Sequence, residues 1–262
     1  MLIHPLSDLH NELRRNEPSP VRLAETGADV IVLAGDIDQG AEGVHWAVRE
    51  SDRLGKPVLY VAGNHEHYGR DIGANLRAMR RAARGSGVHF LENDRVVLGG
   101  VRFLGCTLWT DYRACEDLDR AAIMALAGGR LPDHRLIRSG DALFSPALAL
   151  RRHRRSLRWL RGQLATPFAG PTVMISHHGP SALCGHPVFS PGPLDGAFFS
   201  RLDEWVSQAD VWIFGHTHVS LDARIGGCRL VSNQRGYHGE SSGFEAQKRV
   251  AVELPGRPAP PG

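Results

Sequence analysis

Nine side chains that can bind metal ions follow directly after short apolar runs of this 262-residue chain. They are Asp8, His10, Asp36, Asn64, His65, His177, His178, His216 and His218. Imidazole and carboxylate donors without thiolate suit zinc, manganese, iron or nickel. The set is larger than one tetrahedral ion requires, so it predicts two divalent ions about 3.5–4 Å apart that share one carboxylate. Such a pair activates water and neutralises charge on phosphorus, which favours hydrolysis of phosphate esters.

Each of these residues also has an ordinary structural explanation. A single histidine after a strand is more often a hydrogen-bonded turn residue than a ligand, and a lone Asp-x-His such as Asp8 and His10 is usually a turn with an Asx cap. Repetition at the ends of five apolar runs argues against that explanation for the whole set. In extended backbone, residues two apart point to the same side, so we expect Asp8 and His10 to reach one ion.

The apolar runs predict the strands that position these side chains. They cover residues 2–6, 30–34, 58–62, 173–176 and 211–214. Gly35 lets the backbone turn sharply after one of them and leaves Asp36 at the sheet edge. The strand, helix and strand between residues 30 and 62 imply parallel neighbours with a right-handed crossover. Ligands of open α/β sheets bind beyond the carboxyl ends of the strands, where these side chains lie.

The rest of the chain predicts one domain, residues 1–254. Further expected elements are a short helix before residue 30, helices over 44–51, 72–83 and 198–209, a β-hairpin over 96–104, and strands over 230–233 and 249–253 that close a second sheet. Residues 109–161 are mostly helical in pattern and predict a cap or insertion. The tail 255–262 holds four prolines and is predicted to be disordered.

Composition limits the classes of partner. The formal net charge is +3, from 31 basic and 28 acidic residues, which gives no strong attraction to nucleic acid or membranes. Four scattered cysteines without a Cys-x-x-Cys pair, and no secretory or membrane-spanning segment, predict a cytoplasmic protein. Six arginines lie off the apolar stripe of the helix expected near residues 150–164. A solvated surface face explains them better than a phosphate- or nucleic-acid-binding face, which stays open.

In order and spacing, the polar strand ends resemble the five signature blocks of the calcineurin-like metallophosphoesterases. These blocks are Asp8-x-His10, Gly35-Asp36, Gly63-Asn64-His65-Glu66, His177-x-x-Pro180 and Gly215-His216-Thr217-His218, and together they run from residue 8 to residue 218. As a set they are highly specific, although none is so alone. The resemblance implies an α/β fold, an αββα sandwich of two mixed β-sheets flanked by helices, with a dimetal site at the C-terminal edge of the strands.

The resemblance also implies a role for each matched residue. Asp8, His10 and His218 would hold the first metal, Asn64, His177 and His216 the second, and Asp36 would bridge them. A metal-bridging hydroxide would attack phosphorus in line, and His65 would stabilise or protonate the leaving oxygen. Asp38 resembles the carboxylate that orients this histidine in some relatives, although its spacing differs. His178 is left over, either as a support for the ligands or as a packed turn residue.

Departures from the family patterns narrow the expected substrate. The protein serine/threonine phosphatase branch has glycines beside the first Asp-x-His and an arginine in the second block, where this chain has Ser7, Asn11 and Gln39. Protein phosphatase activity is therefore not expected. The related lipid-A precursor pyrophosphatases lack the histidine of the third block, which is present here as His65. Residues 232–237 resemble an Asn-Pro-Arg-Gly-Tyr element of uncharacterised bacterial members, with Gln234 in place of the proline. Arg235 would hold a substrate phosphate or form a salt-bridged turn.

The predicted function is therefore dimetal hydrolysis of small phosphodiesters or nucleotide-type substrates. The alternatives are a nuclease or phosphomonoesterase acting at the same site, and a non-catalytic metal-binding scaffold. The sequence leaves open the natural substrate, which of manganese, zinc, iron or nickel is bound, and the oligomeric state.

Overall fold

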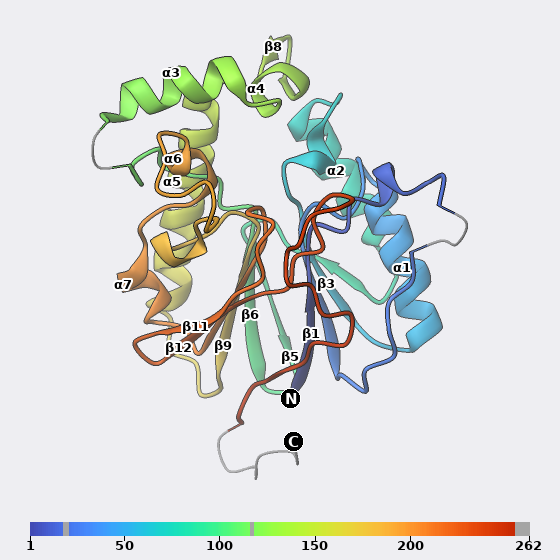
Figure 1. Ribbon diagram of the computed structural model, residues 1–262. Coiled ribbons are helices and arrows are strands. Elements are labelled where there is room, and N and C mark those ends of the chain that lie inside the picture. The colour runs from blue at the N-terminus through green and yellow to red at the C-terminus, as the bar shows by residue number, and fades with distance from the viewer. Residues whose placement is uncertain (18–20, 116–117, 255–262) are drawn as a thin grey trace.

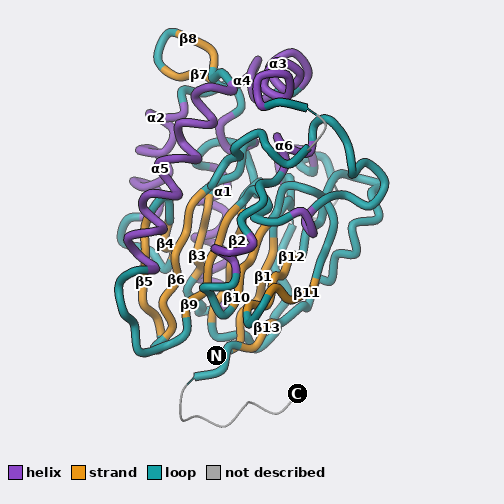
Figure 2. Tube along the Cα trace, turned by 90° about the vertical axis from the view of Figure 1, so that its left-hand side faces the viewer, coloured by secondary structure: helices purple, strands orange, loops and turns teal. Residues whose placement is uncertain are grey.

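The computed structural model describes residues 1–17, 21–115 and 118–254. Two mixed sheets face each other at the centre, and helices cover their outer faces (Figures 1 and 2). This arrangement confirms the expected αββα sandwich. The predicted disordered tail, residues 255–262, lies outside the described residues.

The first sheet has five strands in the order β13-β1-β2-β3-β4. The strands are β1 (Leu2–Leu6), β2 (Val30–Ala34), β3 (Val58–Val61), β4 (Val88–Phe90) and β13 (Val250–Ala251). β1 to β4 are parallel, and β13 runs antiparallel to β1. The prediction that residues 249–253 close the second sheet is therefore wrong, because this segment pairs with the N-terminal strand of the first.

The second sheet has six strands in the order β11-β12-β10-β9-β6-β5. The strands are β5 (Asp94–Leu98), β6 (Val101–Cys106), β9 (Thr172–Ser176), β10 (Val211–Phe214), β11 (Asp222–Ile225) and β12 (Cys228–Ser232). The two edge strands are antiparallel to their neighbours, and the other strands are parallel. The hairpin expected over 96–104 is formed by β5 and β6.

Alternation along the buried strands builds the three layers of the core. In β2, Val30 and Val32 pack between the two sheets, whereas Ile31 and Leu33 face the helices of the first sheet. Successive side chains of a strand point to opposite faces, so a run that is apolar throughout must be covered on both sides. The continuous apolar runs of the sequence are therefore central strands.

The helices have distinct places. α1 (Glu42–Leu54) and α2 (Ile72–Ala83) cover the first sheet, and α5 (Pro146–Leu164) covers the second. α3 (Arg120–Arg130), α4 (Asp133–Leu136) and the hairpin of β7 (Arg138–Ser139) and β8 (Ala142–Leu143) lie beyond the carboxyl ends of the strands, at the top of Figure 1. This part of the segment predicted as a cap stands over the strand ends, whereas α5 packs along the second sheet. No helix in the described ranges is long and apolar enough to span a membrane.

Two local predictions are wrong. Residues 198–209 do not form one helix, because Phe199 is extended and bridges to Gly179, which separates α6 (Asp195–Phe198) from α7 (Asp203–Val206). Residues 21–29 are irregular rather than helical. Trp46 donates to the carbonyl of Val21, and Leu23 donates to the carboxylate of Glu50, so contacts with α1 replace the hydrogen bonds of a helix. The remaining 3₁₀ turns are η1 (Asn11–Leu13), η2 (His65–His67) and η3 (Ala182–Cys184).

Candidate dimetal site

Five parallel strands end at one edge of the sandwich, and the predicted ligands lie in the turns that follow them. Asp8 and His10 follow β1, Asp36 follows β2, Asn64 and His65 follow β3, His177 follows β9, and His216 and His218 follow β10. The two sheets bring their strand ends together beneath α3 and α4 (Figure 1). Residues more than 200 positions apart in sequence therefore become neighbours.

The turns that carry the candidate ligands have unusual backbone conformations. Asp8, His10, Asp36, His216 and His218 all have positive φ, between 47° and 77°. Non-glycine residues in this left-handed region each cost on the order of 1–3 kcal/mol, and such strain concentrates at functional sites. Asp8 and His10 do meet, but not in extended backbone as the sequence suggested, because β1 ends at Leu6 and left-handed turns direct both side chains inward.

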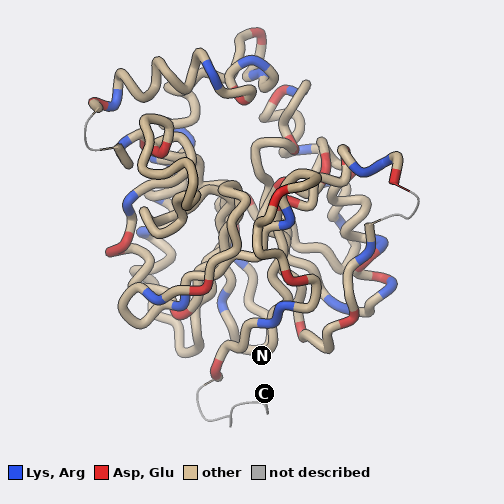
Figure 3. Tube along the Cα trace, viewed as in Figure 1, with Lys and Arg blue, Asp and Glu red and all other residues tan. Residues whose placement is uncertain are grey.

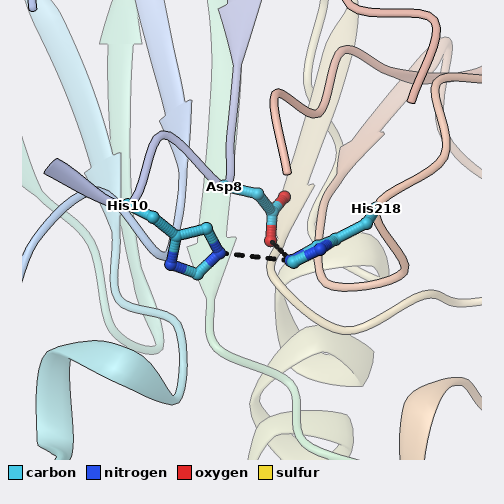
Figure 4. A group of neighbouring side chains, drawn as sticks. All are labelled: Asp8, His10 and His218. Carbon is cyan, nitrogen blue, oxygen red and sulfur yellow. Dashed lines mark hydrogen bonds and ion pairs between the residues drawn. The ribbon is translucent and has the colours of Figure 1, made fainter. Parts of the chain in front are cut away.

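Asp8, His10 and His218 form the first ligand group (Figure 4). Their donor atoms lie within 4.8 Å of one another, and the His10 Nε2 to His218 Nε2 distance is 3.1 Å. The opposite nitrogens face carboxylates: His10 Nδ1 lies 3.1 Å from Glu12 Oε1, and His218 Nδ1 lies 2.6 Å from Glu240 Oε2.

These carboxylates fix the tautomers of the two rings. A neutral histidine that donates its Nδ1 proton to a carboxylate presents an unprotonated Nε2. The lone pairs of His10 and His218 then face each other at 3.1 Å, an arrangement that a cation stabilises and that two neutral rings alone do not. The donor set of the first group therefore fits a divalent ion.

The second group centres on Asn64, His177 and His216. His177 Nδ1 donates to the carbonyl of Ala34 at 2.9 Å, which leaves its Nε2 free. That nitrogen lies 2.9 Å from Asn64 Oδ1 and 3.2 Å from His216 Nδ1. Acceptor atoms again face each other, so this group also fits a cation.

The orientation of Asn64 is set from the cap. Its Nδ2 donates to Asp133 Oδ1 at 2.9 Å, and the Tyr68 hydroxyl donates to the same oxygen at 2.7 Å. Asp133 belongs to α4 and is buried. Because the amide nitrogen is held by Asp133, the amide oxygen must point toward His177.

Asp36 lies between the two groups. Its Oδ1 is 3.4 Å from His177 Nε2, and its Oδ2 is 4.0 Å from His10 Nε2. Burial favours the neutral acid, but the surrounding histidines, with His177 and His65 foremost, hold the pKa of Asp36 well below its usual range. An ionised carboxylate between two cation sites has the position and the charge of a bridging ligand.

Glu66 holds the loops that carry these residues. Its two oxygens accept hydrogen bonds from the backbone N–H groups of Asp36, Ile37 and Gly63 and from the Tyr60 hydroxyl, at 2.7–3.0 Å. Gly35 precedes Asp36, whose N–H donates to Glu66, and has a φ of 90°. A Cβ at Gly35 would collide with the His177 ring. The turns after β2 and β3 are therefore fixed relative to each other.

His65 is not one of the seven proposed ligands, although its ring lies with His10 and Asp36 in a third group whose donor atoms are within 4.8 Å of one another. Its Nδ1 is 3.0 Å from Glu12 Oε1, and its Nε2 is 3.1 Å from the Tyr237 hydroxyl. Burial lowers the pKa of His65, but Asp36 and Glu12 raise it to about 9. The carboxylate at His65 is thus Glu12. Asp38, which we expected there, instead accepts from Arg15 and from the backbone N–H of Gln39.

Other predicted residues lie around the site. His178 is buried, has its Nδ1 3.3 Å from the Thr107 carbonyl oxygen and belongs to no ligand group among the described residues. Arg235 lines a neighbouring hollow. Tyr237 places its ring 4.6 Å from that of His10 and 4.5 Å from that of His218.

Four further residues contact predicted site residues, although the sequence did not predict a role for them: Glu12, Asp133, Tyr237 and Glu240. Glu12 stands two positions after His10, which is the one local signal that could have found it. Tyr237 ends the element at residues 232–237 that resembles Asn-Pro-Arg-Gly-Tyr, so that match was its signal. Asp133 and Glu240 come from the cap and a C-terminal loop, and no pattern in the sequence points to their contacts with the site.

A family model described as calcineurin-like phosphoesterase matches residues 2–220, which include both ligand groups, Asp36 and His65. The chain belongs to the calcineurin-like phosphoesterase family. The family hydrolyses phosphate esters with two divalent metal ions, and the His/Asp groups needed for this chemistry are present.

Similar proteins include one matched by sequence and two matched by structure. An uncharacterised protein, L509 of Acanthamoeba polyphaga mimivirus, is 21% identical over 216 residues, which are 75% of this chain and 74% of that protein. The phosphopantetheinyl hydrolase PptH from Mycobacterium tuberculosis superposes with a TM-score of 0.68 at 18% identity, covering 92% of this chain and 93% of that one. TT1561 of Thermus thermophilus has a TM-score of 0.53 at 14% identity, covering 89% and 88%. At these identities the structural likeness shows the fold alone.

Proposed function

We propose that this phosphoesterase cleaves phosphodiesters, with small phosphorylated or nucleotide-type compounds as substrates. Asp8, His10 and His218 hold one divalent ion, Asn64, His177 and His216 hold the other, and Asp36 bridges them. The observation that supports this assignment is the pair of sites in which lone pairs face each other, with Asp36 between them. Nitrogen and oxygen donors of this kind suit manganese, zinc, iron or nickel.

When bound, two such ions supply a water of lowered pKa and positive charge for the phosphoryl group. The chain itself supplies the proton for the leaving oxygen. His65 is suited to this task because its Nε2 lies 3.9 Å from Asp36 Oδ2, beside the proposed bridge, while Glu12 holds the ring through Nδ1. A histidine that is held but not used as a ligand can donate its proton as the ester bond breaks.

The charges around the ligands favour a diester. Within the described residues, no lysine or arginine forms a hydrogen bond or ion pair with any of the seven proposed ligands, and basic and acidic residues are interspersed along the chain (Figure 3). A phosphomonoester is largely a dianion at neutral pH and gains more than a diester monoanion from additional cationic side chains. With Arg14 and Arg235 in the neighbouring hollows rather than on the ligands, the scissile phosphoryl group would depend mainly on the two ions, which suits the monoanion better.

Hydrolysis of bis(p-nitrophenyl) phosphate and of p-nitrophenyl phosphate tests the proposal. The protein is assayed with manganese, zinc or nickel and after treatment with a chelator, and Asp36→Asn serves as the control without a bridging carboxylate. We expect metal-dependent turnover that favours the diester and is lost in the variant. Preference for the monoester would overturn the diester assignment and leave the metal site standing. No turnover of either ester with two ions bound would contradict the hydrolytic function.

A further inference from the structure

A hollow of about 390 Å³ lies beside the proposed metal site. Arg14, Arg235, Tyr237 and Ser241 are among the residues that line it. A second hollow, of about 350 Å³, is lined by His10 and shares Arg14, Tyr237 and His238 with the first. The two hollows are therefore neighbours, and one of them reaches a proposed metal ligand.

Within the described residues, no carboxylate forms a hydrogen bond or ion pair with Arg235; Glu17, the acid that acts on it, is paired with Arg14. Arg235 is half-buried. Burial, together with the nearby Arg14, lowers the pKa of Arg235. A cation that is partly removed from water without a counter-ion is unfavourable, and an anion in the hollow would relieve that cost.

The charged neighbours of Arg235 are already engaged. Arg14 donates to the carbonyls of Leu9 and Gly236 at 3.0–3.1 Å and pairs with Glu17 at 2.9 Å. Glu240 is the acid in the lining, and its Oε2 accepts the backbone N–H of Tyr237 at 2.7 Å and lies 2.6 Å from His218 Nδ1. Arg14 is thus held in place beside Arg235, while Glu240 is directed toward the metal ligand.

We propose that this hollow binds a second phosphate group of the substrate whose scissile ester lies at the metal site. The inference rests on the proposed function, because it takes the metal site as the place of cleavage. The forked donors of Arg235 match the oxygens of a phosphate. Leu13 and Tyr237, both exposed, line the neighbouring hollow and contact the part of the substrate that joins its two phosphates. The substrate class is a nucleotide phosphodiester that carries a second phosphate, either as a free nucleotide or as adjacent nucleotides of a single-stranded nucleic acid, and a nucleoside bisphosphate serves as the binding probe for the two phosphates.

Calorimetric binding to the manganese-loaded protein tests this proposal without requiring turnover. Thymidine 3′,5′-bisphosphate is compared with thymidine 5′-phosphate for the wild type, for Arg235→Gln and for Arg224→Gln, an exposed arginine on β11 as the matched control. Hydrogen bonds to charged groups predict about 10- to 100-fold tighter binding of the bisphosphate to the wild type. We expect the same ratio in Arg224→Gln and a ratio near one in Arg235→Gln.

Equal affinity of the two ligands for the wild type, absence of binding by both, or a ratio that survives Arg235→Gln would overturn the proposal. Hydrolysis of bis(p-nitrophenyl) phosphate, measured on the same preparations, shows separately whether the proposed function holds. A thymidine pentanucleotide distinguishes the two sources of the second phosphate. If the pentanucleotide binds more tightly than the bisphosphate and the gain depends on Arg235, the hollow binds single-stranded nucleic acid. If there is no such gain, the hollow binds a free nucleotide.

Discussion

The two groups of metal ligands have similar donor atoms, but the residues that hydrogen-bond to these ligands on the side away from the ion differ. His10 and His218 of the first group are backed by the carboxylates of Glu12 and Glu240. His177 of the second is backed by a backbone carbonyl, and Asn64 is oriented by Asp133 of the cap. A carboxylate behind a histidine raises its basicity as a ligand, whereas a carbonyl mainly fixes its tautomer.

This difference suggests that the two ions are not held equally. The first group has anionic support from an N-terminal turn and from the loop around Glu240. The second group depends on the position of the cap, because Asp133 fixes the amide of Asn64. We therefore expect the first group to bind its ion more tightly, and the second to respond to changes in α4.

The largest effect is expected for His65→Ala, which should slow catalysis while both groups of metal ligands stay intact. The substitution removes the proposed proton donor but no proposed ligand, so kcat on diesters with poor, alkoxide leaving groups should fall about 10²- to 10⁴-fold with two ions still bound, and less on bis(p-nitrophenyl) phosphate, whose leaving group needs little protonation. Steady-state kinetics and metal analysis of the same sample measure both quantities. Loss of one ion in this variant would instead make His65 a ligand.

Glu240→Gln probes the carboxylate support of the first group. Because Glu240 faces Nδ1 of His218, the variant should weaken the tighter metal-binding step about 10- to 100-fold and leave the other step unchanged. Asp222→Asn is a matched control, since Asp222 has a similar exposure but pairs with Arg229. Isothermal titration with manganese measures the two steps, and an effect on the weaker step alone would reverse the comparison.

Asp133→Ala probes the second group from the cap. Without this carboxylate the amide of Asn64 is free to turn and the Tyr68 hydroxyl loses its acceptor, so the weaker step should lose about tenfold in affinity. The free energy of unfolding should fall by about 1–3 kcal/mol in urea denaturation. Asp141→Ala, an exposed residue of the same cap, is the control. A variant that binds both ions normally would show that the cap does not position Asn64.

Tyr237→Phe gives the smallest effect. The ring contacts with His10 and His218 stay, and only the hydroxyl 3.1 Å from His65 Nε2 is removed. One neutral hydrogen bond corresponds to about a two- to tenfold fall in kcat. The fall should be larger for esters with poor leaving groups, since these depend more on His65. A change in KM alone would place Tyr237 in substrate binding rather than in the positioning of His65.

The strand ends were the predictable part of this site. Each apolar run marks a buried strand, and the carboxyl ends of parallel strands share one edge, so Asp36, Asn64, His177 and His216 had to lie close together. The local pattern also identified α1, α2 and α5, because their apolar faces repeat at helical spacing.

The residues that support the ligands could not be predicted in the same way. Asp133 meets Asn64 across 69 positions, and Glu240, in the irregular segment after β12, meets His218 across 22, so neither contact has a periodic signal. The same limit explains the error on β13, whose sheet is decided by pairing with Leu2 and Ile3 at the far end of the chain. Phe199 broke an expected helix for a similar reason, since its partner Gly179 lies in another turn.

The most direct test of the central claim is a calorimetric titration of the metal-free protein with manganese. Two ligand groups joined by Asp36 predict two ions per chain in distinguishable steps. Glu240→Gln should weaken only the tighter step and Asp133→Ala only the other. A single ion per chain, or one step that both variants weaken equally, would contradict the account of two separately supported metal sites.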